Sequence, residues 1–199
     1  MSAADAAQLR KVALHPAEPT RAKSFFIWAG LSLLGFPLGG LLGNVVGGRV
    51  DSITPALIGG ALTGAGIGLA QWWMLRRSLG IGLEWIVATS VGLAAGLAIG
   101  AAVVNYETTL SQLAIMGAIS GATVGIAQGL LLRSKFSMWH VWMIAMPAFW
   151  AIGWATTTAG GIKVEKQFTV FGAYGAVAFA ILSWALLMAG SRREMSPSA

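Results

Sequence analysis

Long apolar stretches alternate with short polar segments along most of the chain. Each stretch reaches the roughly 20 residues that an α-helix needs to cross about 30 Å of hydrocarbon. The stretches are Phe25–Gly43, Pro55–Leu75, Leu83–Val104, Thr109–Leu132, Met138–Ala159 and Phe168–Ala189. This pattern predicts an all-α integral membrane protein with six transmembrane helices.

A second pattern recurs with a step of 57 residues (117 − 60 and 85 − 28). The segment Gly60–Gln71 returns as Gly117–Gln128, and Trp28, Trp85 and Trp142 are separated by the same step. A fixed period of this size is typical of a duplicated structural unit. We therefore expect three tandem antiparallel hairpins, all inserted the same way round. They would occupy residues 24–80, 81–137 and 138–190.

Glycine recurs at every fourth position in the repeated segments and in the first and third apolar stretches. These glycines include Gly35, Gly39, Gly60, Gly64, Gly68, Gly92, Gly96, Gly117, Gly121 and Gly125. The hydrophobic effect contributes little to the association of helices in lipid. Helix bundles in membranes therefore depend on close approach of the backbones through small residues. The spacing predicts glycine-zipper packing between neighbouring helices.

Gln71 and Gln128 each stand three residues after the last glycine of a repeated string, on the same helix face. Each is expected to form a hydrogen bond across a helix pair, worth about 0.6 to 2 kcal/mol. Contact with a ligand is the alternative that we favour less, because the adjacent glycines already explain these residues. In the third hairpin, Leu182 or Ala185 stands at the place expected for glutamine.

Basic residues are divided unevenly between alternate polar segments. The net charge is +6, and ten of the 13 Lys and Arg residues fall in the two chain ends and in the second and fourth segments between helices. By the positive-inside rule, this asymmetry predicts that both termini are cytoplasmic. The predicted parts are a cytoplasmic amino-terminal tail (1–23), a transmembrane domain (24–190) and a cytoplasmic carboxyl tail (191–199).

The predicted outer segments carry one comparable acidic residue in each hairpin: Asp51, Glu107 and Glu165. Around a pseudo-threefold axis these acids could form a ring, which attracts cations at a pore mouth. The simpler interpretation, which we favour, is that short loops carry charges in order to remain in water.

The residue types present argue against enzymatic chemistry. The chain has no cysteine, and its sequence shows no Ser–His–Asp set, carboxylate pair, phosphate loop or metal-ligand cluster at membrane depth. Its basic residues do not form a stripe interleaved with stacking aromatic residues, as a nucleic-acid surface would. We therefore expect no enzymatic activity, cofactor, bound metal or nucleic-acid partner. The role of Trp150 and Trp154, which share one helix face, stays open between a pocket, a partner contact and lipid.

The segments Gly66–Arg77 and Gly125–Arg133 resemble the glycine-rich "QW…LR" repeats of small uncharacterised bacterial multipass membrane proteins. The resemblance covers about two thirds of the chain. It implies residence in the bacterial cytoplasmic (inner) membrane and carries no known activity.

Two functional classes fit these patterns. The first is a structural or accessory subunit whose bundle packs against a membrane-protein partner, a second copy of itself or lipid. The alternative is a small-solute or ion transport component, or a passive pore, along the pseudo-threefold axis with the outer acids at its entrance. We favour the first class, because close glycine packing tends to close the centre of a bundle.

Overall fold

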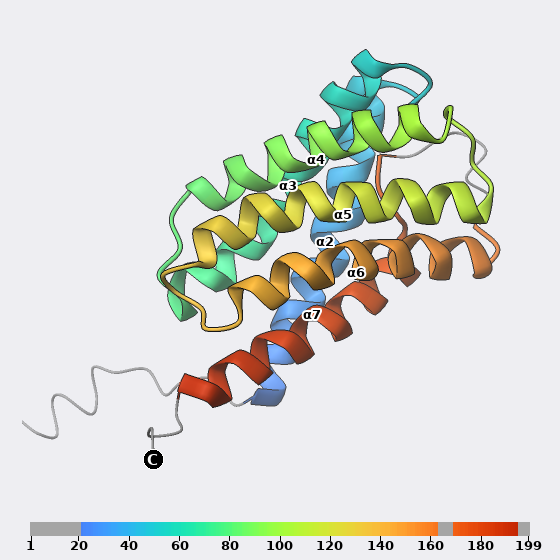
Figure 1. The fold of residues 1–199 in the computed structure, drawn as a ribbon. Helices are drawn as coiled ribbons and strands as arrows, with labels where there is room; N and C mark the ends of the chain where they lie inside the picture. Colours follow the sequence, from blue (N-terminus) through green and yellow to red (C-terminus); the bar gives the residue numbers. More distant parts are fainter. Residues whose placement is uncertain (1–20, 163–168, 195–199) are drawn as a thin grey trace, which may run out of the picture.

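The computed structural model describes residues 21–162 and 169–194, with side chains as far as residue 190. The described residues form six helices and the turns between them (Figure 1). The helices are α2 (Arg21–Gly47), α3 (Ile53–Ser78), α4 (Glu84–Val103), α5 (Leu110–Leu132), α6 (Trp139–Ala159) and α7 (Ala173–Glu194). The prediction of an all-helical chain is confirmed.

Five of these helices are long and apolar enough to cross a membrane, which makes the chain a multi-pass membrane protein by length and composition. The exception is α6, although it has 21 residues. Its composition explains the difference, because four tryptophans, one histidine and three consecutive threonines lower its mean hydropathy. The expectation of six long helices is therefore confirmed, and five of them have the length and apolar composition that spanning requires.

The helices close into a ring. Each helix packs against the one that follows it in the chain, and α2 also packs against α7. Figure 1 shows the consequence, because the beginning of α2 and the end of α7 lie close together at the bottom of the view. Short connections join most of the helices, so successive helices run antiparallel. Two of these connections place a glycine in the left-handed region, Gly48 at φ 83° and Gly80 at φ 60°.

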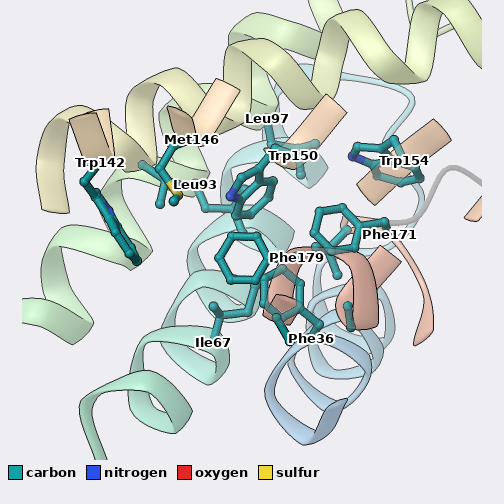
Figure 2. Close-up of a cluster of buried hydrophobic side chains, with 14 of the residues drawn as sticks. Phe36, Ile67, Leu93, Leu97, Trp142, Met146, Trp150, Trp154, Phe171 and Phe179 are labelled. Carbon is teal, nitrogen blue, oxygen red and sulfur yellow. The ribbon is translucent and has the colours of Figure 1, made fainter. Parts of the chain in front are cut away.

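Aromatic side chains fill the middle of the ring. Phe36 of α2 stacks on Phe171 with ring centroids 4.8 Å apart, and it lies 4.9 Å from Phe179 of α7. Trp150 of α6 meets Phe171 edge-on at 5.4 Å. These four side chains are at most 1% exposed, and Figure 2 shows them pointing toward one another between the helices. The core of the protein therefore lies on the axis of the ring.

Large apolar side chains also cover the outside of the ring. Ile144 is 76% exposed, Val45 is 72% exposed and Leu34 is 57% exposed. A soluble protein of this size seldom exposes so many such residues, whereas a lipid-facing surface requires them.

Candidate functional site

The most specific polar feature of the interior is a pair of tryptophan–glutamine hydrogen bonds. Trp85 of α4 donates its indole N–H to Oε1 of Gln71 on α3 at 3.1 Å. Trp142 of α6 donates in the same way to Oε1 of Gln128 on α5, also at 3.1 Å. Each pair is separated by 14 residues in the sequence. The same contact thus joins α3 to α4 and α5 to α6.

A further set of bonds joins the two pairs into one network. The side-chain amide of Gln128 donates to Oε1 of Gln71 at 3.1 Å and to the hydroxyl of Thr89 at 2.9 Å. Thr89 in turn donates to the carbonyl of Trp85 at 2.7 Å. All five side chains are at most 2% exposed. Because an unpaired buried polar group costs about 1–3 kcal/mol, the network fixes the mutual position of α3, α4, α5 and α6.

The third tryptophan of the repeated set has a different partner. Trp28 of α2 donates its indole N–H to the hydroxyl of Ser183 on α7 at 2.9 Å, and this bond links the first helix to the last. The sequence period places Leu182 or Ala185 at the position expected for glutamine, whereas the residue that accepts from Trp28 is Ser183. Ser183 follows Gln128 by 183 − 128 = 55 residues, so α7 is shifted by two positions from the period.

Serine is shorter than glutamine, and the polar network stops at this edge of the ring. The hydroxyl of Ser32, which precedes Thr89 by 57 residues, is buried and has no hydrogen-bond partner among the described residues. Met146 stands 57 residues after Thr89 and places a thioether there instead of a hydroxyl. The buried hydroxyls of α6 and α7 form bonds outside this network: Ser183 accepts from Trp28, and Thr157 accepts from the backbone N–H of Gly175.

The ten predicted glycines all lie against a neighbouring helix. A Cβ atom added to any of them would come closer than 3.0 Å to an atom of another helix. At Gly60 it would lie 2.8 Å from Cα of Ala94, and at Gly92 it would lie 2.9 Å from Cα of Val124. Such distances leave no room for a side chain unless a helix moves.

Two of the three predicted outer acids, Asp51 and Glu107, lie within the described residues. Asp51 and Glu107 are both exposed, and Asp51 accepts a hydrogen bond from Ser52 at 3.3 Å. Glu165 lies outside the described residues. The proposed ring of acids therefore stays a prediction.

Basic and aromatic side chains gather at the opposite end of the bundle. The guanidinium of Arg76 lies 4.1 Å from the ring centre of Trp73, and that of Arg133 lies 5.8 Å from Trp139. Lys135, beyond α5, donates to the carbonyl of Gly80, beyond α3, at 2.5 Å. The basic ends of α3 and α5 are thus on the same side of the bundle.

Trp150 and Trp154, whose role the sequence left open, point into the ring and are each 1% exposed (Figure 2). Trp154 also lines a cavity of about 280 Å³ beside α2. Across the described parts of the chain, histidine and acidic residues form no group of three or more that could hold a metal ion.

Comparisons of the chain with known protein families, with curated proteins and with solved structures find no match. The resemblance to "QW…LR" membrane proteins therefore stays a prediction from the sequence.

Sequence reasoning missed that the tryptophans are the donors to the glutamines. The signal was present, because both glutamines precede a repeated tryptophan by 14 residues. In the sequence these tryptophans served only as markers of the 57-residue period, because tryptophan is also common at membrane interfaces, where it needs no such partner. The partnership of Trp28 with Ser183 had no such signal, since 155 residues separate the two.

Proposed function

We propose that the chain is a non-enzymatic structural or accessory subunit of the bacterial cytoplasmic membrane. In this role the bundle packs against a membrane-protein partner, a second copy of itself or lipid. The observation that carries the proposal is the filled axis of the ring, where Phe36, Trp150, Phe171 and Phe179 are buried against one another. A closed interior with an apolar exterior suits a protein that acts through its outer surface.

The proposal treats all six helices as spanning, in three tandem hairpins. Support for α6 comes from its packing between α5 and α7, both of which are long and apolar enough to cross. If α5 and α7 cross the bilayer, the antiparallel helix that is packed along both must cross it as well. The repeated Trp–Gln bonds at a separation of 14 residues support duplication of the hairpin.

Glycine-zipper packing is the proposed means by which these hairpins hold together. It is supported by the close approach of helix backbones at the ten glycines. Van der Waals contact through small residues is the main source of helix association in lipid, because hydrophobic burial contributes little there.

The proposed topology places both termini in the cytoplasm. The lysine and arginine residues at the ends of α3 and α5 support it, because basic residues collect on the cytoplasmic side of membrane proteins. The exposed Asp51 and Glu107 would then face the outside.

The alternative, a transport component or passive pore along the repeat axis, would require the central aromatic side chains to move aside. Reconstitution into vesicles tests both functions. We expect no flux of small ions or neutral solutes above that of protein-free vesicles, together with a partner or a dimer retained in native mass spectrometry. Flux that disappears when Asp51, Glu107 and Glu165 are all neutralised would contradict the proposal and support the pore.

A further inference from the structure

Three of the four cation–aromatic contacts among the described residues lie at the end of α3. The guanidinium carbon of Arg76 lies 4.1 Å from the ring centre of Trp73 and 4.6 Å from that of Trp72. The guanidinium carbon of Arg77 lies 5.7 Å from Trp73. All three distances are within the limit of about 6 Å at which an indole attracts a cation. Two tryptophans one turn earlier on the helix therefore position both arginines.

Neither of these arginines forms an ion pair or a hydrogen bond with the residues that the structure describes. Of the described acids, Glu84 is the one at this end of the bundle, and its carboxylate accepts the backbone N–H of Gly82 at 2.9 Å. Nε is the buried nitrogen of Arg76, so its two terminal nitrogens stay accessible, and Arg77 is exposed. The terminal donors of both guanidiniums are therefore available to a group outside the chain.

The outer face of α3 places these donors at the level of lipid headgroups. This helix has 26 residues and is about 39 Å long, which exceeds the hydrocarbon thickness of about 30 Å. Leu69 and Trp73, which are 53% and 49% exposed, precede Arg77 by eight and four residues on one face. The face thus passes from an apolar side chain through an indole to a cation. A phospholipid presents its acyl chain, ester and phosphate in the same order.

The second hairpin provides an internal comparison. Arg133 follows Arg76 by 133 − 76 = 57 residues and therefore occupies the equivalent position at the end of α5. Gly129 and Leu130 stand at the places of the two tryptophans, and Arg133 contacts a single ring, that of Trp139 on α6, at 5.8 Å. The positive-inside rule accounts for an arginine at both helix ends, whereas the pair of indoles is present at the first alone.

We propose that Arg76 and Arg77 bind the phosphate of an anionic phospholipid. A guanidinium that contacts an aromatic ring keeps a planar fork of N–H donors, which matches two oxygens of a phosphate. The carbonyl end of the helix opposes an anion with about half an elementary charge, and the two arginines exceed it. The inference rests on the proposed accessory function for its membrane setting, and it names the lipid against which the subunit packs. The proposed topology determines the leaflet, which is the cytoplasmic one.

The test is native mass spectrometry of the full-length protein in detergent, titrated with phosphatidylglycerol and with phosphatidylcholine of the same acyl chains. Both lipids carry a phosphate, but the choline group cancels its charge. We expect phosphatidylglycerol to bind more tightly by about fivefold for each of the two arginines, the gain that one basic residue provides near an anionic membrane surface. Equal binding of the two lipids would overturn the proposal.

Arg76→Gln and Arg133→Gln form a matched pair. Each removes one positive charge from the same side of the bundle, at equivalent positions of the repeat. We expect Arg76→Gln to lower the preference for phosphatidylglycerol about fivefold and Arg133→Gln to leave it nearly unchanged. Equal losses in the two variants would show that net charge alone attracts the lipid, and would overturn the assignment to α3.

Trp73→Leu separates positioning from charge. It keeps every arginine and removes the ring that both guanidiniums contact. The side chain is 49% exposed, so its replacement does not disturb the packed interior. We expect the preference for phosphatidylglycerol to fall, whereas a purely electrostatic attraction would leave it unchanged and would contradict the proposed site.

Inorganic phosphate distinguishes a lipid from a free anion. Added as its ammonium salt, it should not displace phosphatidylglycerol any better than ammonium acetate of equal ionic strength. Displacement by phosphate alone would identify a site for a free anion and overturn the lipid. Neither solute flux nor a protein partner enters these measurements, so the accessory function can fail without changing them, and the reverse also holds.

Discussion

Gln71 and Gln128 touch each other in the interior, with the amide of Gln128 donating to Oε1 of Gln71 at 3.1 Å, although 57 residues separate them. The two residues that the sequence repeats thus meet in the structure. Each glutamine also receives an indole N–H from a tryptophan 14 residues further along the chain. A polar group in each of two hairpins therefore specifies how those hairpins pack together.

Replacement of Gln128 tests the value of this network. Gln128→Leu removes three hydrogen bonds and leaves the indole N–H of Trp142 buried without a partner. At about 0.6 kcal/mol for an average bond of this kind, we expect the free energy of unfolding to fall by about 2 kcal/mol. Gln112→Leu, on the partly exposed first turn of the same helix, should have little effect. The measurement is reversible unfolding in mixed micelles, and equal losses in the two variants would contradict the assignment.

Two serine-to-alanine changes compare a paired hydroxyl with an unpaired one. Ser183→Ala removes the acceptor of the Trp28 indole and should cost about 1–3 kcal/mol. Ser32→Ala removes a buried hydroxyl that has no partner among the described residues, and should leave stability unchanged or raise it. Melting temperatures in detergent would show the order. A larger loss in Ser32→Ala than in Ser183→Ala would contradict the bonding described for Trp28.

Gly64 and Gly30 test the proposed role of the glycines. A Cβ at Gly64 would lie 2.7 Å from Cα of Ser90, whereas one at Gly30 would have no neighbour within 4 Å. Gly64→Ala should therefore separate α3 from α4 at a cost of about 1–3 kcal/mol. Gly30→Ala should be neutral or should stabilise its helix by up to about 1 kcal/mol. The same unfolding assay measures both, and full tolerance of Gly64→Ala would argue against close backbone packing there.

Opening the aromatic cluster tests whether a filled axis excludes flux. Phe36→Ala removes a fully buried ring that contacts Phe171 and Phe179, and should destabilise the protein by about 3–5 kcal/mol. The milder Phe36→Leu keeps the fold available for assay in vesicles. We expect no solute flux from wild type. A wild type that conducts would contradict this expectation. If Phe36→Leu then conducts equally well, the side chain of Phe36 does not block the pathway.

The helices themselves could be predicted from the sequence, often to within a residue. The predicted stretch Thr109–Leu132 became α5, Leu110–Leu132, because apolar length alone determines a helix in lipid. The last helix differed, since the apolar stretch begins at residue 168 and α7 begins at Ala173. Val170 and Phe171 are apolar because they are buried in the bundle, not because they are helical. Hydropathy cannot distinguish these two causes.

The interior could be predicted only in part. Positions for Gln71 and Gln128 followed from the glycine spacing, which places them on a packed face. The partner of Trp28 could not be predicted, because the two-residue shift of α7 leaves no trace in composition. The burial of Trp150 and Trp154 depends on the closing of α2 against α7, a contact between the two ends of the described chain.

The central claim is that successive hairpins enter the membrane the same way round. The chain has no cysteine, so single cysteines introduced at Arg77 and Arg133 can be labelled from each side of oriented membranes with an impermeant maleimide. The account predicts that both are labelled from the cytoplasmic side, whereas cysteines at Asp51 and Glu107 are labelled from the outside. Labelling of positions 77 and 133 from opposite sides would contradict it.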